Sequence, residues 1–511
     1  MPMNFVTDGS ATTDKKISLK TEICIIGSGA GGAVAGFFLA QAGYEVTILE
    51  AGHFHPPGSQ EGKSETHIMA TLYEKSAMQM NASQDVMILQ GRAIGGSTLV
   101  NQAVCYRLPE QIADKWTMDH QVEGKTLADL SQYYEKVEKV ITPKITPEQF
   151  LNENNKIAMR GFKENKWNNG YMKRNTSHCV GCGSCPMSCS IGAKNSMDRT
   201  FLPMAHQAGA KIISGFQATE IRLKKNSIEK IVGKVSNKDK SSFEIFADTF
   251  ILAGGAIQTP VLLQRSKYKD KSGQIGKNLI IHPFIFPQAL FDRKLDSFKG
   301  VPQAVYSFEF AHFGHKELGS ILLYGDFEGF VGSAFQMSGV GDNFGENLAN
   351  FRHLAQSLVI INETARGVIT ASASDYKIEY ELTDRDRETL AAAARHMGNV
   401  FFSQGARKYF VGNKEYKNPQ DLQKISAADM EPYKINIIGA HPMGTCRMGK
   451  PENSVVDSYG KIHDLENGYI CDASILPDST GVNPQLTIMA IAAQIAERID
   501  LKLKSRGERK K

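Results

Sequence analysis

The sequence predicts an α/β fold in which a domain with a buried parallel sheet is interleaved with an α+β domain built on an antiparallel sheet. Two patterns lead to this prediction. Residues 22–50 consist of a short apolar run, a glycine-rich turn, a helical segment and a second apolar run, which is typical of a β-α-β unit. Residues 211–250 and 284–381 contain runs in which apolar side chains alternate with a period of two, as in antiparallel strands.

Length and composition exclude several classes of protein. The chain has 511 residues, of which 41% are apolar and 22% charged, so it is not disordered, collagen-like or a coiled coil. Its net charge of +5 is spread along the sequence, which argues against nucleic acid as a partner. Residues 1–20 contain no apolar signal segment, and the uncharged run 23–44 contains six glycines and divides into strand, turn and helix. We therefore expect a cytoplasmic protein with no membrane span.

The N-terminal unit carries a dinucleotide-binding pattern. In its turn, Gly27, Gly29 and Gly32 satisfy the spacing G-x-G-x-x-G, which lets the backbone approach a pyrophosphate and lets the helix pack closely on the strand. The helix N-terminus stabilises the diphosphate, and Glu50 can accept hydrogen bonds from ribose hydroxyls. This motif alone leaves FAD and NAD open. The strand, helix and strand of the unit are expected at residues 22–27, 31–43 and 45–50.

The remaining elements are assigned from the same two periodicities. Residues 211–250 are expected to form an antiparallel meander that ends in a buried strand at 249–253. The sequence Thr-Asp-Arg-Asp at 383–386 predicts the N-terminal cap of a long helix at 387–404. The other segments expected are a helix at 259–265, antiparallel strands at 304–310, 358–362 and 376–381, and a strand, loop and helix at 468–500.

Further motifs lie in both halves of the chain. Residues 91–101 read Gly-Arg-Ala-Ile-Gly-Gly-Ser-Thr-Leu-Val-Asn, a loop of backbone donors that ends in an amide side chain. Together with the N-terminal motif, this loop resembles the flavin-contacting signature of the glucose-methanol-choline (GMC) oxidoreductase family. Further blocks resemble later motifs of that family, in the family's order: 255–263, 275–279 with 282–283, 441–449, and 472–474 with 483–487.

The resemblance implies a GMC fold and an FAD-dependent enzyme. A Rossmann-like FAD-binding domain is then interleaved with an α+β substrate-binding domain built on an antiparallel sheet. The implied reaction oxidises the CH–OH group of a sugar or glycoside, a long-chain alcohol or a sterol-like compound to an aldehyde or ketone, with hydride transfer to flavin. The expected segments are 18–105, 190–283 and 434–505 for the FAD-binding domain, 106–189 and 284–433 for the substrate-binding domain, and 1–17 and 506–511 for flexible termini.

The same resemblance implies the site residues. His441 maps to the family's base, since a neutral imidazole can take the hydroxyl proton at pH 7. Asn483 maps to its partner and can donate a hydrogen bond to the substrate oxygen. No histidine lies between His67 and His120, near the position where some relatives attach the flavin covalently, so we expect non-covalent FAD. The residues expected to contact FAD are Gly27, Gly29, Gly32, Glu50, Arg92, Gly96, Asn101, Asp472 and Pro484.

Four cysteines form a separate cluster with the spacing Cys-x2-Cys-x2-Cys-x3-Cys. This is the local spacing of a bacterial ferredoxin, and soft thiolates suit iron–sulfur clusters, but Ser190 replaces the proline that follows the fourth ferredoxin cysteine. The residues leave three alternatives open: an iron–sulfur cluster, a zinc site, or a loop of packed thiols. The four residues are Cys179, Cys182, Cys185 and Cys189.

The cysteines bear on the electron acceptor. With an iron–sulfur cluster, electrons could pass from the flavin to an external acceptor, and the enzyme would be a dehydrogenase. Without a cluster, dioxygen could reoxidise the flavin directly, and the enzyme would be an oxidase. Two rival functions remain: a flavin-binding lyase of the same fold, and an electron-transfer subunit whose functional centre is the cysteine cluster.

Overall fold

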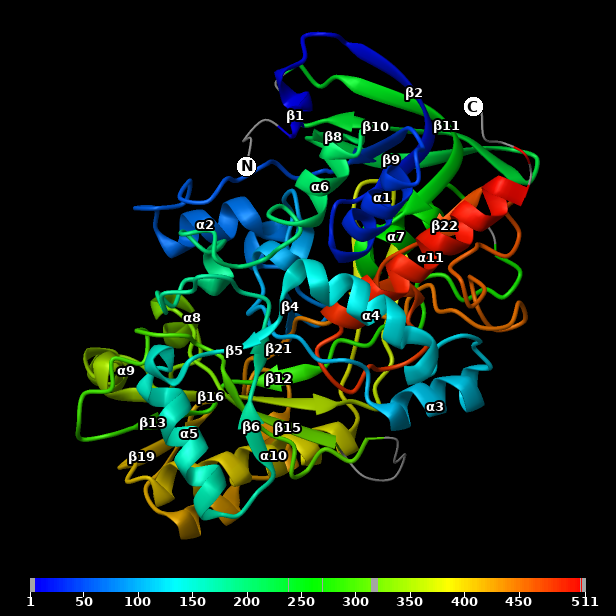
Figure 1. Ribbon diagram of the computed structural model, residues 1–511. Helices are drawn as coiled ribbons and strands as arrows, with labels where there is room; N and C mark the ends of the chain where they lie inside the picture. The colour runs from blue at the N-terminus through cyan, green and yellow to red at the C-terminus, as the bar shows by residue number, and fades with distance from the viewer. Residues whose placement is uncertain (1–4, 238, 269, 314–319, 506, 508–511) are drawn as a thin grey trace.

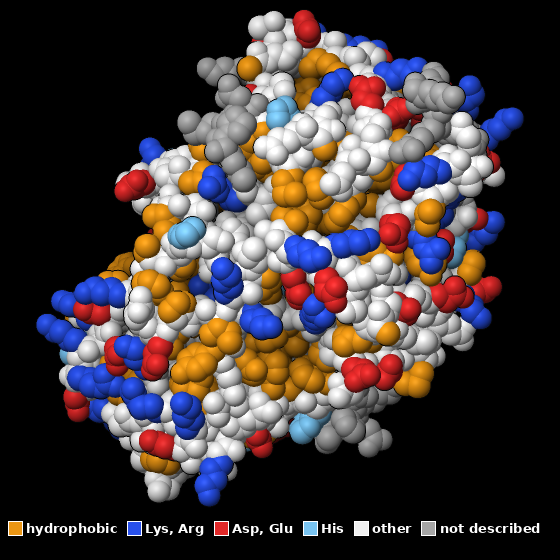
Figure 2. All heavy atoms as spheres, viewed as in Figure 1, with side chains coloured by type: hydrophobic (Ala, Val, Ile, Leu, Met, Phe, Trp, Pro, Cys, Tyr) orange, Lys and Arg blue, Asp and Glu red, His pale blue; other side chains and the backbone are white. Residues whose placement is uncertain are grey.

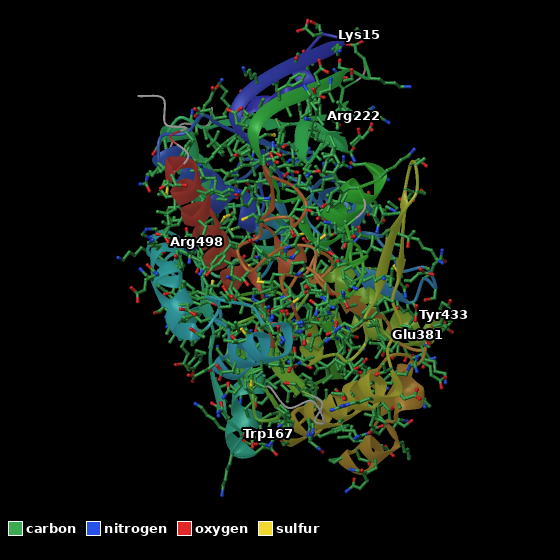
Figure 3. The ribbon with its side chains drawn as sticks, turned by 90° about the vertical axis from the view of Figure 1, so that its right-hand side faces the viewer. Lys15, Trp167, Arg222, Glu381, Tyr433 and Arg498 are labelled. Carbon is green, nitrogen blue, oxygen red and sulfur yellow. The ribbon has the colours of Figure 1, made fainter. Side chains whose placement is uncertain are left out.

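Two large sheets organise the part of the chain that the structure describes. The computed structural model describes residues 5–237, 239–268, 270–313, 320–505 and 507. The first sheet and its helices form the upper part of Figure 1, and the second sheet forms the lower part. Figure 3 shows the same division from the side, with Lys15 and Arg222 toward one end of the molecule and Trp167 toward the other. The fold is mixed α/β, as the sequence predicted.

The first sheet has eight strands and is parallel at its centre. β2 (Lys16–Ile26) lies between β3 and β11 and is parallel to both, and β8 lies parallel to β3 on its other side. The order is β1-β8-β3-β2-β11-β10-β9, with β22 beside β11. The other bounds are β1 (Thr7–Asp8), β3 (Val46–Leu49), β8 (Lys211–Ser214), β9 (Phe216–Lys224), β10 (Ser227–Val235), β11 (Ser242–Leu252) and β22 (Gly468–Ile470).

The predicted N-terminal β-α-β unit consists of β2, α1 (Ala30–Gln41) and β3. The residues of α1 are almost all apolar and buried, because this helix packs on the sheet and also contacts α6 (Phe201–Gln207) and α11 (Gln485–Ser505). The turn between β2 and α1 therefore lies at the carboxyl end of the central strands. Open α/β sheets bind their ligands at this edge.

One strand of the expected antiparallel meander belongs elsewhere. The run 211–250 was expected to be antiparallel throughout, and β9, β10 and β11 do pair in that way. β8 instead lies parallel to β1 and β3. The reason is its connection: the chain reaches β8 through helix α6, and a strand that follows a helical crossover runs parallel to its neighbour. Residue 238 of this run lies outside the described residues.

The second sheet has ten strands and is mainly antiparallel. Its central strand, β16 (Leu354–Asn362), is buried along almost its whole length and pairs with β12, β13 and β15. The order is β20-β19-β13-β16-β12-β21-β4, with β15, β14 and β6 continuing from β16. The other bounds are β4 (Val86–Ile88), β6 (Asn169–Tyr171), β12 (Pro283–Ile285), β13 (Gln288–Leu290), β14 (Val305–Ser307), β15 (Ser320–Gly325), β19 (Lys408–Val411), β20 (Lys414–Tyr416) and β21 (Ile437–Gly439).

Helices α5 (Glu153–Glu164) and α10 (Asp384–Ser403) pack against the second sheet and against each other. The predicted cap of α10 is present, since the Thr383 hydroxyl accepts a hydrogen bond from the Asp386 N–H at 3.2 Å. Two short pairs lie outside the large sheets, and the expected strand at 376–381 belongs to one of them. These pairs are β17 (Val368–Ala371) with β18 (Tyr376–Glu379), and β5 (Lys144–Ile145) with β7 (Lys173–Arg174).

The remaining helices border these two sheets, and α4 packs on α11. Within the described residues, no helix is long and apolar enough to cross a membrane. Figure 2 shows Lys and Arg side chains interspersed with Asp and Glu over one face. The bounds of these helices are α2 (Glu65–Leu72), α3 (Glu110–His120), α4 (Leu127–Ile141), α7 (Gly255–Arg265), α8 (Phe330–Phe335) and α9 (Asp342–Ala349).

Three segments of the chain differ in the structure from the domain boundaries expected from the sequence. β4 and β21 were assigned to the FAD-binding segments 18–105 and 434–505, yet they pair with each other in the second sheet. The two strands carry little sequence signal because each has only three residues. Residues 5–17, expected to be part of a flexible terminus, contain β1 and the start of β2. Residues 1–4, 506 and 508–511 of the expected flexible termini lie outside the described residues.

Candidate active site

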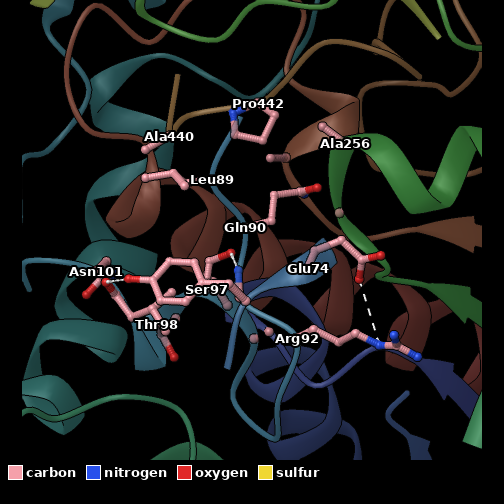
Figure 4. Close-up of a pocket in the computed structure, with 18 of the residues that line it drawn as sticks. Glu74, Leu89, Gln90, Arg92, Ser97, Thr98, Asn101, Ala256, Ala440 and Pro442 are labelled. Carbon is pink, nitrogen blue, oxygen red and sulfur yellow. Dashed lines mark hydrogen bonds and ion pairs between the residues drawn. The ribbon is translucent and has the colours of Figure 1, made fainter. Parts of the chain in front are cut away.

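A cavity of ≈ 400 Å³ joins the edge of the first sheet to one face of the second. Figure 4 shows part of its wall. One end is lined by the β2–α1 turn, and the other end is lined by His441, Asn483 and apolar residues of β12 and β16. Its volume falls within the range of small-molecule and cofactor sites.

The glycine-rich end of the cavity has the shape of a backbone cradle. A Cβ placed on Gly29 would meet nothing within 4 Å, so this glycine borders open space. A Cβ on Gly96 would lie 2.9 Å from the Gly29 Cα, so the two glycine loops touch each other through their backbones. The N-terminus of α1 follows directly, and its free N–H groups and dipole favour an anion. This end therefore fits a diphosphate.

Gly32 differs from the other glycines of the motif because it does not line the cavity. A Cβ on Gly32 would lie 2.0 Å from the Gly27 carbonyl oxygen, so Gly32 allows α1 to pack closely against the turn.

Glu50 lies at the end of β3, and its carboxylate is tied to the turn. Its Oε2 accepts hydrogen bonds from the Ser28 N–H (3.0 Å) and hydroxyl (2.7 Å), and its Oε1 accepts one from the Gly52 N–H (2.9 Å). Burial raises the pKa of Glu50, and these hydrogen bonds oppose that shift. Glu50 also lines the cavity, so it both shapes the turn and is available to a ribose.

Arg92 lines the same part of the cavity. Its Nε lies 3.8 Å from Glu74 Oε2, and Figure 4 shows this ion pair across the cavity wall. Nearby, the Gly91 N–H donates to the Ser97 hydroxyl at 3.0 Å, which closes the second glycine loop on itself.

Asp472 joins two elements at the centre of the cavity. Its Oδ2 accepts hydrogen bonds from the Gly255 N–H (2.8 Å) and the Thr259 hydroxyl (2.6 Å), both in the first turns of α7. Burial raises the pKa of Asp472, and these donors oppose the shift. Asn101 is held in a similar way, since its Nδ2 donates to Gln485 Oε1 at the start of α11. Residues at the N-terminal ends of α7 and α11 therefore hold the side chains of Asp472 and Asn101 in position.

His441 and Asn483 lie in contact, as the resemblance implied. His441 Nε2 is 3.2 Å from Asn483 Nδ2, and both residues line the cavity. Asn483 Oδ1 accepts a hydrogen bond from the Tyr324 hydroxyl at 3.3 Å, which orients the amide so that its NH₂ group faces the imidazole. Burial lowers the pKa of His441 to about 4, so its ring is neutral at pH 7.

The other side of the His441 ring contacts a second histidine, to which sequence reasoning gave no role. His441 Nδ1 lies 3.2 Å from Nδ1 of fully buried His282. His282 Nε2 lies 2.7 Å from the Ser479 hydroxyl, which itself donates to Asn362 Oδ1 at 3.0 Å. The His-Pro dipeptide at 282–283 was visible in the sequence, but its contact spans 159 residues and has no local signal.

We assign the hydrogens on the ring nitrogens from these contacts. Since the Ser479 proton points to Asn362, Ser479 accepts from His282 Nε2–H. His282 Nδ1 is then an acceptor, and His441 Nδ1 must carry the hydrogen between the two rings. His441 Nε2 therefore presents a lone pair beside Asn483, which is the form that a base requires.

The wall beyond His441 is apolar. Phe284 of β12 pairs with Ile360 of β16 in the sheet, and both line the cavity together with Phe286 and Leu358. Farther along, Glu328 also lines the cavity, beside Asp326. Burial and the neighbouring Asp326 and Glu65 raise the pKa of Glu328 to about 8, so the Glu328 carboxyl group is mostly neutral at pH 7.

The four cysteines of the cluster differ in exposure and in hydrogen-bond partners. Cys182 is exposed, and Cys179 packs beside an apolar cluster, whereas Cys185 and Cys189 are buried. Cys185 Sγ accepts a hydrogen bond from the buried Arg174 guanidinium at 3.0 Å. Among the described residues, no three His, Cys, Asp or Glu side chains are grouped to hold a metal ion. The described part of the chain thus shows neither the iron–sulfur site nor the zinc site.

The packed-thiol alternative agrees with the contacts of Lys194. Its N–H donates to Cys189 Sγ at 3.3 Å. Its buried ammonium group donates to the carbonyls of Leu99 (2.7 Å), Asn101 (2.8 Å) and Cys185 (2.8 Å). The cysteine turn is thus tied to the second glycine loop, and its residues 186 and 187 line the cavity.

The structure brings most of the residues expected from the sequence into one cavity. Sequence reasoning missed His282, Ser479 and Tyr324, which orient the predicted pair. The expected site residues that line the cavity are Gly27, Gly29, Glu50, Arg92, Gly96, Asn101, His441, Asp472, Asn483 and Pro484.

Comparisons with known proteins show which family the sequence matches. Residues 25–58 match a family described as an NAD(P)-binding Rossmann-like domain, and residues 69–284 and 363–492 each match one described as GMC oxidoreductase. The chain is 28% identical over 505 residues to an uncharacterised GMC-type oxidoreductase, y4nJ, of Sinorhizobium fredii, covering 96% of each protein. It is also 28% identical over 525 residues to the long-chain-alcohol oxidase FAO3 of Arabidopsis thaliana, covering 96% of this chain and 69% of that protein.

The fold is also similar to that of a solved structure. Pyridoxine 4-oxidase from Mesorhizobium loti superposes with a TM-score of 0.72 at 17% sequence identity, over 94% of this chain and 99% of that one.

Proposed function

The chain belongs to the GMC oxidoreductase family, and we propose that it oxidises the CH–OH group of an apolar alcohol with FAD as cofactor. The observation that carries this proposal is the lone pair of His441 Nε2 beside the Asn483 amide, where the diphosphate cradle meets an apolar wall. A base and a hydrogen-bond donor at this junction match the needs of a hydroxyl group that is to lose its proton.

The residues of the cavity fit FAD. GMC oxidoreductases are FAD flavoproteins, and the cavity extends from the Gly29 and Gly96 cradle past Asp472 to His441. Gly29, Gly96 and the N-terminus of α1 would hold the diphosphate, Glu50 the ribose, and Asn101 with Asp472 the region nearer His441. FAD, when bound, supplies the acceptor for the hydride that leaves the carbinol carbon. No histidine is present between His67 and His120, so we propose that FAD binds non-covalently.

The side chains at the other end of the cavity handle the proton. The substrate hydroxyl gives its proton to His441 Nε2, which is free to accept it because His441 Nδ1 donates to His282. The Asn483 NH₂ group donates a hydrogen bond to the substrate oxygen and cannot compete for the proton. The apolar wall of Phe284 and Ile360 excludes water, which keeps the hydroxyl in contact with the base.

We assign the substrate to the apolar alcohols, either long-chain or sterol-like, rather than to sugars. The wall contains Phe284, Phe286, Leu358 and Ile360, an apolar surface suited to an alkyl chain or a sterol, and its polar side chains include Gln303, Asp326 and Glu328. The similarity to a long-chain-alcohol oxidase supports this assignment. The similarity to a long-chain-alcohol oxidase also supports dioxygen as the electron acceptor, which makes the enzyme an oxidase.

Anaerobic bleaching of the bound flavin tests this function. The FAD-loaded protein is mixed with dodecanol, a sterol, glucose or choline, and the flavin absorbance is followed. The proposal expects bleaching by the apolar alcohols and none by glucose or choline. A lyase would leave the flavin oxidised with every alcohol, and bleaching by glucose alone would contradict the substrate class.

A further inference from the structure

A second cavity of ≈ 520 Å³ lies next to the hydrogen-bonded residues that follow His441 and His282. Ser479 and Asn362 line it, and both belong to the hydrogen-bonded chain that begins at His441. We propose that His282 and Ser479 carry the substrate proton from His441 into this second cavity. The inference rests on the proposed function, and it makes His282 and Ser479 positioning residues of that reaction.

The chain of contacts is continuous. His441 Nδ1 and His282 Nδ1 are 3.2 Å apart, and His282 Nε2 and Ser479 Oγ are 2.7 Å apart. The Gly481 N–H also donates to Ser479 Oγ at 3.0 Å, which fixes the hydroxyl in position. Each link is a hydrogen bond of ordinary length, so a proton can pass along the chain without movement of the backbone.

The backbone at His282 is held in a conformation that brings its ring into the chain. His282 has φ +51°, which is uncommon for a residue with a side chain. Glu363 Oε1 accepts hydrogen bonds from the Ile281 N–H (2.6 Å) and the His282 N–H (3.1 Å), and it thereby holds this conformation. Backbone strain that is supported in this way is typical of functional positions.

The second cavity is suited to water. Glu363 is 4% exposed and lines the cavity, and its Oε2 has no hydrogen-bond partner among the described residues. The buried Ser320 hydroxyl, also in the wall, is likewise without a partner there. Unpartnered buried polar atoms in a roomy cavity are normally satisfied by water. Asp119 lines the cavity and is exposed, so the cavity reaches the protein surface.

The transfer balances at every atom. His441 Nε2 gains the substrate proton, and the proton on His441 Nδ1 passes to His282 Nδ1. The Ser479 hydroxyl turns from Asn362 Oδ1 toward the second cavity and releases its proton to a water molecule there, while the proton on His282 Nε2 passes to Ser479 Oγ. Both rings stay neutral and exchange tautomers, and no electrons move. The reverse transfer restores both tautomers and delivers a proton to the main cavity, as reduction of dioxygen to hydrogen peroxide requires.

The charged groups around His282 disfavour a doubly protonated ring. The groups that face the ring are His441, Arg366 and Asp478, and Arg366 pairs with Asp478 at 2.6 Å. Burial, His441 and Arg366 together lower the pKa of His282 well below its usual value, against the smaller effect of Asp478. A ring with this pKa does not hold a second proton, so a proton that enters on one nitrogen leaves from the other.

Proton release during a single turnover tests the path. The FAD-loaded protein is mixed anaerobically with alcohol in weak buffer with a pH indicator, so that flavin bleaching and proton release are followed together. Ser479→Ala and His282→Gln are expected to slow proton release about tenfold or more relative to bleaching. Thr389→Val, a matched control in the wall of the second cavity, is expected to release protons as fast as it bleaches. Simultaneous release and bleaching in Ser479→Ala would overturn the proposal.

A second readout does not depend on catalysis. In protein labelled with ¹⁵N-histidine, the ring signals of His441 and His282 are expected to show hydrogen on His441 Nδ1 and His282 Nε2, with neither ring titrating between pH 6 and 9. Hydrogen on His441 Nε2 would contradict the relay even if no tested alcohol bleached the flavin. If the rings show the expected tautomers but no alcohol bleaches the flavin, the proposed function is refuted and the assigned hydrogen-bonded chain is not.

Discussion

Tyr324 and Asn483 are joined by a hydrogen bond of 3.3 Å from the tyrosine hydroxyl to the amide oxygen. This bond turns the Asn483 NH₂ group toward His441 Nε2, 3.2 Å away. Without it, the amide could rotate by 180° and present its oxygen to the imidazole, and that arrangement would oppose a lone pair on Nε2. A strand of the second sheet therefore orients the donor beside the base.

Tyr324→Phe should slow flavin reduction without a large change in KM. The variant keeps the ring in place and removes one hydrogen bond, which is worth about 1 kcal/mol, or about a fivefold change in rate. Anaerobic stopped-flow bleaching measures the effect. Tyr306→Phe is the matched control, since Tyr306 pairs with Tyr324 across β14 and β15 and lies outside the His441 network. Equal losses in both variants would mean that the hydroxyl of Tyr324 does not orient Asn483.

The acid limb of the pH profile should lie unusually low. Because burial lowers the pKa of His441 to about 4, Nε2 keeps its lone pair as the pH falls through the ordinary histidine range near 6.5. Flavin reduction should stay constant from pH 8 to about 5 and fall below that, as the ring takes up a proton and can no longer act as a base. The rate constant for anaerobic bleaching across pH 4–8, with bound FAD verified by absorbance, measures this limb. If the rate constant fell to half its maximum near pH 6.5, the His441 ring would be more solvated than the structure indicates.

The KM for apolar alcohols should rise in alkali. The pKa of Glu328, raised to about 8, means that its carboxyl group is neutral below that pH and ionised above it. An ionised carboxylate in the wall opposes burial of an alkyl chain, so KM should increase several-fold between pH 7 and 9. Glu328→Gln should reduce this increase, whereas Glu379→Gln, an exposed position in β18, should not. The same increase in Glu328→Gln would exclude Glu328 as its source.

The glycine motifs and the His441–Asn483 pair were predictable, because each lies in a local block with a recognisable order. The residues that orient the pair were not, since His282 and Tyr324 each reach it across 159 residues of chain, and Ser479 contacts His282 across 197 residues. Their side chains meet only after the second sheet has formed.

The role of the cysteine cluster could not be predicted from the sequence. Its spacing is equally compatible with a metal site and with a packed turn. The contacts of Arg174 and Lys194 with the buried thiols favour the packed turn, and spacing contains no information about them.

Protein purified without oxygen should contain less than one iron atom per chain and no stoichiometric sulfide. The reason is that Cys185 and Cys189 already accept hydrogen bonds within the protein and Cys182 is exposed. Cys182→Ser should leave bleaching by alcohol and reoxidation by dioxygen unchanged. Stoichiometric iron, with reoxidation lost in Cys182→Ser, would restore the iron–sulfur alternative.

In the proposed reaction, His441 Nε2 takes the proton of an apolar alcohol. This role is tested by anaerobic bleaching of the FAD-loaded protein by dodecanol, compared between the unaltered chain and His441→Ala. We expect His441→Ala to fold and bind FAD, but its flavin should bleach at about one hundredth of the rate of the unaltered chain, or more slowly still. Bleaching of His441→Ala at the rate of the unaltered chain would contradict the claim.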